Sequence, residues 1–216
     1  MTGSAAGPRT SILAIDSATT RVVVAVGTLT GELIDATEWP AGYRHGETLL
    51  PTIAALLERL ELTPASVAAV VVGTGPGAFT GLRVGIATAK GIAHALGVPI
   101  VGVSTADALL AGAGQDSVLL LPAGPADRLL AEPGRPARLV PAGEDPGVPG
   151  DATLIALDLA DRAPADALER GETARAGLGA SLLTLGATRL AAGQVDDLAG
   201  LVPEYVTLPR GVTTQS

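Results

Sequence analysis

Two segments of this 216-residue chain carry residues whose types and spacing could do chemistry. The first is Asp16-Ser17-Ala18-Thr19-Thr20, which follows the apolar run 12–15. In a loop of the form Asp-x-Gly-Thr the backbone can approach a phosphate group, because glycine has no Cβ. Here Ala18 stands at the glycine position, and its Cβ hinders that approach. Two interpretations stay open: a phosphate-binding loop, or a hairpin turn in which Asp16 binds neighbouring backbone amides.

The second segment is glycine-rich and covers residues 73–85, GTGPGAFTGLRVG. It leads into a predicted helix, whose first turn offers unpaired N–H groups and the positive end of the helix dipole. A P-loop is excluded because no Lys-Ser/Thr pair follows, and the dinucleotide fingerprint is excluded because Thr80 stands at its third glycine. The segment could bind an anion, but a purely structural turn is the favoured interpretation.

No constellation for metal or nucleophilic catalysis is found. His45 is followed four residues later by Leu49, where a helical zinc site needs a second histidine, and His94 has no partner at a matching spacing. The chain contains no cysteine, and no G-x-S-x-G elbow supports a serine nucleophile. We therefore expect no catalytic residue, no metal and no cofactor, with His45 capping or flanking a helix.

The elements that position these loops are predicted from their apolar patterns. Residues 45–60 form an amphipathic helix pattern, and residues 81–96 form a helix rich in small residues. Strand, glycine-rich loop, helix and strand make a βαβ unit over residues 69–103, which indicates a mostly parallel sheet. The strands predicted in this half are 12–15, 21–27, 33–38, 70–72 and 100–103.

Helix ends follow from capping chemistry. Thr80 is expected to cap the helix 81–96, and Gly97 is expected to end it. Pro51 fits only if the first helix begins near Thr48, which would place the proline in the first turn. In the second half the pattern predicts a helix capped by Ser104 and running to about Ala113, strands at 118–121, 127–131, 137–140 and 154–157, an exposed loop at 141–150 and a helix at 178–192.

The helix 81–96 carries small residues in two rows. One row is Gly81, Gly85, Ala89 and Ala93, and a second row beside it is Ala87, Gly91 and Ala95. Glycine costs about 1 kcal/mol per helical position relative to alanine, so the glycines need a reason. Small residues let another backbone approach closely. Packing on the chain's own sheet and contact with a second subunit are both open explanations.

Composition limits the partners. The formal net charge is −8; residues 1–103 hold six Lys or Arg against seven Asp or Glu, and residues 104–216 hold eight against fifteen. Aromatic residues make up 2% of the chain, so neither clustered cations nor stacking platforms favour direct nucleic-acid binding. No apolar stretch reaches about 18 residues and no signal peptide is found, so we expect a cytoplasmic protein without a membrane segment.

The organisation predicts two related α/β lobes. We expect a disordered lead-in over residues 1–10, a first lobe over residues 11–103 that holds the glycine-rich loop, and a reduced second lobe over residues 104–216.

Three segments together resemble the bacterial TsaB family, also called YeaZ. They are ILAIDSATT, HGETLLPTIAALLERL and, above all, GTGPGAFTGLRVGIATAKGIAHALGVPIVGVS, and the resemblance is dense over about residues 11–110. The block Gly75 to Gly85 is its most specific part. The sequence departs from the family pattern at residues 117–132, SVLLLPAGPADRLLAE, which lack the usual tyrosine, and in the tail PEYVTLPR.

The resemblance implies an actin-like (ASKHA, ribonuclease H-like) two-lobed α/β fold without a catalytic site. It implies a subunit that binds and activates TsaD, the paralogue that transfers threonylcarbamoyl to the adenosine beside the anticodon of tRNAs reading ANN codons. It also implies a homodimer when the protein is alone, and a TsaE-like ATPase in the larger complex. In the family, the helices matching residues 48–60 and 81–96 make the contacts, which here gives Leu49, Ile53, Leu56, Leu60, Gly81, Gly85, Ala89 and Ala93 as interface residues.

The alternative is an actin-like ATPase or small kinase. It would need Asp16 and the loop Gly73–Gly81 to hold phosphate and Mg²⁺, and Ala18 argues against it.

Overall fold

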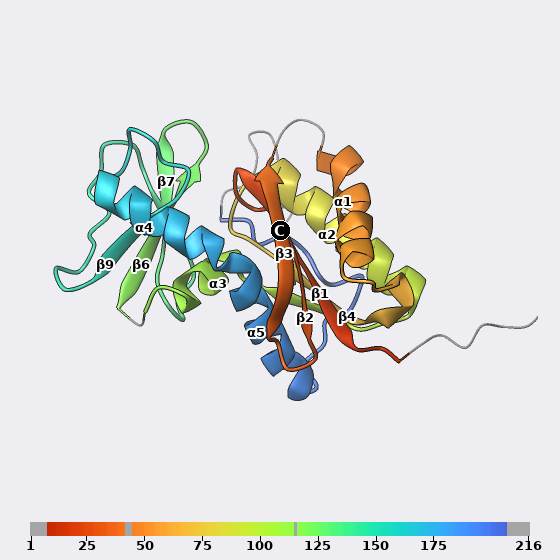
Figure 1. The fold of residues 1–216 in the computed structure, drawn as a ribbon. Helices are drawn as coiled ribbons and strands as arrows, with labels where there is room; N and C mark the ends of the chain where they lie inside the picture. Colours follow the sequence, from red (N-terminus) through yellow and green to blue (C-terminus); the bar gives the residue numbers. More distant parts are fainter. Residues whose placement is uncertain (1–7, 42–44, 115, 207–216) are drawn as a thin grey trace, which may run out of the picture.

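The computed structural model describes residues 8–41, 45–114 and 116–206, which fold into two β-sheets with helices packed around them (Figure 1). The first sheet has the strand order β3-β2-β1-β4-β5. Its centre β1 pairs antiparallel with β2 and parallel with β4, so the sheet is mixed. Its strands are β1 (Ser11–Asp16), β2 (Arg21–Thr28), β3 (Leu33–Pro40), β4 (Val67–Gly73) and β5 (Ile100–Val103).

The second sheet repeats this plan in a shorter form, with the order β8-β7-β6-β9. Its centre β6 pairs antiparallel with β7 and parallel with β9, as β1 does with β2 and β4. It lacks a counterpart of β5. Its strands are β6 (Ser117–Ala123), β7 (Asp127–Ala131), β8 (Arg138–Val140) and β9 (Thr153–Ala156).

The helices form three layers around the sheets. Helices α1 (His45–Arg59) and α2 (Phe79–Leu96) cover one face of the first sheet, while α3 (Thr105–Ala111) and α5 (Leu178–Ala191) cover its other face (Figure 1). The core around α3 and α5 also includes side chains of β6, β7 and β9, so these two helices join the sheets. Helix α4 (Ala165–Ala176) packs on the second sheet. A 3₁₀ turn, Pro64–Ser66, precedes β4.

The α/β class and most predicted elements are confirmed. Every predicted strand is present with bounds that differ by a few residues at most, and the helix 178–192 corresponds to α5. Gly97 ends α2 in the left-handed conformation with φ 60°, and the Ser104 hydroxyl caps α3 by accepting a hydrogen bond from the Asp107 amide. The loop 141–150 is largely exposed. No helix in the described ranges is both long enough and apolar enough to cross a bilayer.

Two predicted helix starts are wrong. Helix α1 begins at His45 rather than near Thr48, so Pro51 lies inside the helix. The proline ring is exposed, and the buried stripe that begins at Leu49 holds the helix on the sheet despite the lost hydrogen bond. Helix α2 is preceded by Ala78, and Thr80 lies within its first turn without capping it. The start of α2 is set by its contact with the loop after β1, where the Ala78 amide donates to the Ala18 carbonyl.

Helix α4 was not predicted, because its sequence ADALERGETARA has no stripe of large apolar residues. It packs instead through small residues, and a Cβ built on Gly171 would lie 1.9 Å from the carbonyl oxygen of Ala156 in β9. This close backbone contact leaves no trace in an apolar periodicity.

The inner row of small residues on α2 faces the chain's own sheet. Ala89 and Ala93 belong to the buried core, and a Cβ on Gly81 would lie 2.2 Å from the carbonyl oxygen of Ser17. On Gly85 it would lie 2.1 Å from the Ser17 hydroxyl oxygen. The backbone that needs this space belongs to the same chain, which favours packing on the chain's own sheet as the explanation of the row. The assignment of the row to a partner contact stays a prediction.

The predicted interface residues of α1 also face the chain's own first sheet. Leu49, Ile53 and Leu56 are buried against the first sheet, and Leu60 is partly buried beside them. By contrast, the outer row Ala87, Gly91 and Ala95 is exposed, and nothing lies within 4 Å of a Cβ built on Gly91.

The start of the described chain is held in place. The Arg9 guanidinium donates to the carbonyl oxygens of Leu96 and Gly97 at 2.7 and 3.2 Å, and the Thr10 amide donates to the Ser66 carbonyl. The lead-in expected over residues 1–10 is therefore not free of contacts at its end, whereas residues 1–7 lie outside the described residues. The division into lobes at residue 103 stays a prediction, and α5 contacts all five strands of the first sheet.

The two rows of α2 give a matched stability test. Gly81→Ala is expected to lower the free energy of unfolding by about 1–3 kcal/mol, because the new methyl meets a backbone oxygen that cannot rotate away. Gly91→Ala, in open space on the same helix, is expected to raise it by up to about 1 kcal/mol. Urea unfolding followed by circular dichroism measures both. Equal effects of the two substitutions would contradict the packing described here.

Candidate functional site

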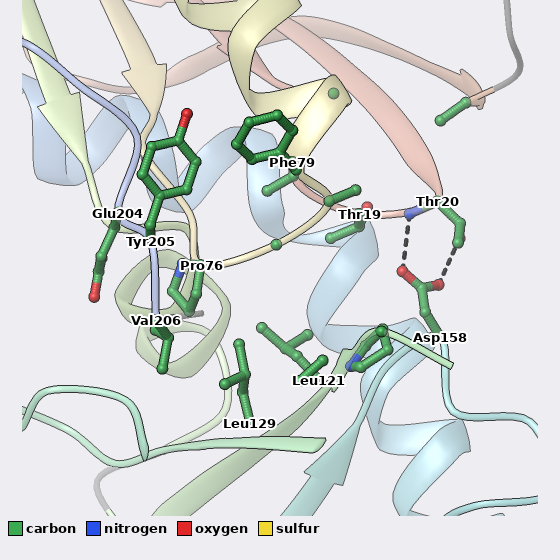
Figure 2. A pocket seen from close by; sticks show the side chains of 18 residues that line it. Thr19, Thr20, Pro76, Phe79, Leu121, Leu129, Asp158, Glu204, Tyr205 and Val206 are labelled. Atoms are coloured by element: carbon green, nitrogen blue, oxygen red, sulfur yellow. Dashed lines mark hydrogen bonds between the residues drawn. The ribbon is translucent and has the colours of Figure 1, made fainter. Parts of the chain in front are cut away.

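A cavity of about 570 Å³ lies between the loops of the two sheets (Figure 2). One wall comes from the loop after β1 and from the glycine-rich segment before α2. The opposite wall comes from the ends of β6 and β7 and from Asp158, which follows β9. Residues Glu204, Tyr205 and Val206 close one side. The lining is largely apolar.

Asp16 does not face this cavity. Its side chain is fully buried and accepts hydrogen bonds from the Thr105 hydroxyl at 2.6 Å and from the Ala18 amide at 2.9 Å. A Cβ on Gly73 would lie 1.8 Å from one of its carboxylate oxygens. Burial raises the pKa of Asp16 to about 6, and the two hydrogen bonds partly oppose this rise. Of the two interpretations of this loop, the turn in which Asp16 binds local groups matches the structure.

Backbone groups of the glycine-rich segment form hydrogen bonds within the chain itself. The Gly75 amide donates to the Thr105 hydroxyl oxygen, and the Gly75 carbonyl accepts from the Thr105 amide and the Ser104 hydroxyl. A Cβ on Gly77 would lie 2.1 Å from the Ala18 carbonyl oxygen. Gly75 itself has φ 103°, a conformation that favours glycine. These contacts support the structural interpretation of the segment.

A polar cluster at the edge of the cavity joins the exposed Thr20 to the side chains of Asp158 and Arg175. The Asp158 carboxylate accepts from the Thr20 amide at 2.8 Å and from the Thr20 hydroxyl, as Figure 2 shows, and it pairs with the Arg175 guanidinium at 2.9 Å. The side chains of Asp158 and Arg175 are each 7% exposed. Sequence reasoning missed both, since Asp158 follows an ordinary strand pattern and Arg175 lies on the unpredicted helix α4.

The other side of the cavity carries aromatic and acidic groups. Phe79 and Tyr205 pack with ring centroids 5.2 Å apart, and the Arg83 guanidinium lies 4.7 Å from the centroid of Phe79 (Figure 2). Burial raises the pKa of Glu204, and the charge of Asp107 raises it further. The Arg175 guanidinium beside Asp158 is already paired.

The histidines do not form a site in the described residues. His45 is the first residue of α1, in line with the expectation that it flanks the helix, and His94 lies exposed in the last turn of α2. Within the described ranges, no group of three or more His, Asp or Glu side chains is placed to hold a metal ion.

A second candidate site is the outer face of α1 and α2, which pack side by side (Figure 1). Small residues are exposed on both helices among charged and polar ones, and Leu50 on α1 is 54% exposed. We define the helix-pair surface by the exposed residues Leu50, Ala54, Ala87, Gly91 and Ala95. None of the eight predicted interface residues lies on it, although they lie on the same two helices.

Comparison with known proteins finds similarity to proteins of tRNA modification. The family model described as "TsaD: tRNA N6-adenosine threonylcarbamoyltransferase" matches residues 40–132. An uncharacterised protein of Mycobacterium tuberculosis is 42% identical over 100 residues, which cover 46% of this chain and 47% of the relative. The tRNA threonylcarbamoyladenosine biosynthesis protein TsaB of Escherichia coli is 35% identical over 105 residues, which cover 47% of this chain and 43% of the relative.

The solved structure of YeaZ from Pseudomonas aeruginosa has the same fold, with a TM-score of 0.69 at 24% identity over 91% of this chain and 99% of that chain. The predicted α/β fold is thereby confirmed, and it is the fold of YeaZ. In sequence, however, the match spans about half the length of these curated relatives or less.

Asp16 predicts a pH dependence of stability. Because its pKa is about 6 in the folded chain and near 4 in the unfolded chain, the folded state binds more protons between these values. The free energy of unfolding should therefore fall as the pH rises from about 4 to about 6. A difference of about two in pKa corresponds to about 3 kcal/mol at most.

The test compares wild type with Asp16→Asn by urea unfolding at pH values from 4.5 to 7.5. The stability of wild type relative to the variant should fall by about 2–3 kcal/mol across this range. A constant difference between the two proteins would show that Asp16 does not titrate as its burial requires.

Proposed function

Because the chain belongs to the TsaB (YeaZ) family, we propose that it serves as a non-catalytic subunit in tRNA threonylcarbamoyladenosine biosynthesis. In this role it binds and activates a TsaD-like threonylcarbamoyltransferase, which modifies the adenosine beside the anticodon of tRNAs that read ANN codons. Direct contact with the tRNA is left to the partner, since cations are few in this chain and Arg9, Arg21, Arg59, Arg170, Arg175 and Arg189 are engaged with groups of the chain itself.

The observation that carries this proposal is the contrast between the two candidate sites. At the cleft, the groups suited to chemistry are occupied: Asp16 is buried and hydrogen-bonded, and Asp158 is paired with Arg175. At the helix-pair surface, small residues stand in open solvent. A surface of small residues lets a partner helix approach closely, and an exposed leucine adds apolar area for the contact.

We further propose that a second copy of the chain uses the helix-pair surface when the partner is missing. A two-fold pair of α1–α2 units would place one small row against the other, as an isologous dimer requires. The homodimer and the TsaD complex would then compete for one surface. A TsaE-like ATPase would join the larger complex elsewhere, and all components would act in the cytoplasm.

Substitution on the helix-pair surface tests this function. Ala87→Arg places a long charged side chain on the exposed row of α2 without entering the core, so the chain should stay folded. It should abolish co-elution with a TsaD-like protein of the same organism in size-exclusion chromatography and reduce the threonylcarbamoyladenosine content of tRNA in a complemented depletion strain. Ala176→Arg, on the exposed end of α4, is the control and should leave both unchanged.

Two results would contradict the proposal. A folded Ala87→Arg variant that binds the partner as well as wild type would remove the helix-pair surface from the contact. Normal tRNA modification in cells that lack the chain would remove the function itself.

The alternative of an actin-like ATPase or small kinase has one supporting observation, the cavity between the sheets. Titration calorimetry of the isolated chain with Mg-ATP decides between the two functions. The subunit proposal expects no binding in the micromolar range and no phosphate release. Tight binding with turnover would favour the enzyme.

A further inference from the structure

Asp158 combines an uncommon backbone conformation with three hydrogen-bond donors around its carboxylate. Its φ is 56°, in the left-handed region that non-glycine residues seldom adopt, and its carboxylate is buried. The carboxylate accepts from a backbone amide, a hydroxyl and a guanidinium. Such a conformation persists only where its surroundings hold it, and here they are the three donors.

The three donors come from both sheets. Thr20 belongs to the loop that joins β1 to β2 in the first sheet, while Asp158 follows β9 in the second sheet and Arg175 ends α4 behind it. Thr20 forms three hydrogen bonds that connect residues 8–103 with residues 116–176: two to Asp158 and one with Arg175. The remaining contact between the sheets runs through α3 and α5, which share an apolar core with both sheets. These helices also form hydrogen bonds to the first sheet and its loops, such as the bond from the Thr105 hydroxyl to Asp16.

Arg175 completes the cluster. Its guanidinium contacts Asp158 at 2.9 Å and the Thr20 hydroxyl oxygen at 3.2 Å, and it also pairs with Glu172 on its own helix. A backbone N–H, a hydroxyl and a guanidinium that converge on one point are the donors that would hold a phosphate oxygen. In this chain the negative charge at that point is a carboxylate of the chain itself.

We infer that Asp158 is an internal anion that locks the two lobes together across the cleft, in the place where the loop after β1 would otherwise receive a phosphate group. The lock holds the cleft at one fixed width. It also occupies the Thr20 amide and hydroxyl, which donate to Asp158 and so cannot donate to a ligand. The first lobe, which carries the helix-pair surface, and the second sheet then move as one body.

The absence of native cysteine allows a direct test with two spin labels, on Ala78→Cys and Ala123→Cys, which stand on opposite walls of the cavity. Distances are measured by pulsed electron paramagnetic resonance. With Asp158 present we expect one narrow distribution. Asp158→Gly, which suits the positive φ and leaves Arg175 paired with Glu172, should shift it to longer distances and broaden it.

Asp158→Asn should give an intermediate shift, since the amide keeps one acceptor but loses the ion pair. Asp166→Asn is the matched control, because it breaks an exposed pair with Arg170 on the same helix α4 and should leave the distribution unchanged. The same distribution in wild type, Asp158→Gly and Asp158→Asn would overturn the inference.

A measurement without substitutions covers the case in which the variants fail to fold. The lock predicts that the Thr20 amide, which donates to Asp158 at 2.8 Å, exchanges its hydrogen much more slowly than an unprotected loop amide. Exchange of Thr20 at the unprotected rate in the wild-type chain would equally overturn the inference.

Discussion

The contact between the loop after β1 and the glycine-rich segment before α2 is the constraint on which the rest of the structure depends. The carbonyl oxygens of Ser17 and Ala18 lie where the Cβ atoms of Gly81 and Gly77 would be. The Ser17 hydroxyl donates to the Gly81 carbonyl at 2.8 Å, and the Ala18 carbonyl accepts from the Ala78 amide at 2.7 Å. Backbone meets backbone here, so only glycine fits. The contact sets where α2 begins and turns Asp16 inward toward Thr105.

The same contact explains why residues that look suited to phosphate binding are used structurally. In an open loop, Asp16 and the amides of the glycine-rich segment would face solvent and could meet a ligand. Here Asp16 is sealed beneath Gly73, and the groups of Gly75 are bonded to Ser104 and Thr105. The cleft that remains is mostly apolar, and its buried ion pair is internal.

The sequence predicts what depends on local pattern and misses what depends on long-range contacts. The strands, α2 and α5 follow from apolar runs and from glycine and serine at helix ends, which act over a few residues. The sequence does not decide whether the row from Gly81 to Ala93 faces the chain's own sheet or a partner. Close approach of either backbone requires the same small residues. Helix α4 was missed because its contact with Ala156 is made through the backbone of a glycine, which gives no apolar pattern. The pair Asp158–Arg175 was missed because its partner Thr20 is distant in the sequence.

The two glycine-containing rows of α2 now have separate explanations. Gly81 and Gly85 are required by the chain itself, since a Cβ at either position would collide with Ser17. Gly91 is not required by the chain, since nothing lies within 4 Å of a Cβ built there. Glycine at this position costs about 1 kcal/mol of helix stability relative to alanine. No contact within the described fold offsets this loss of helix stability, because no atom of the chain packs against Gly91. A surface that must admit another backbone does offer one. The unexplained glycine thus supports a partner on the outer face of α2, although the residues first predicted for that contact proved to be core.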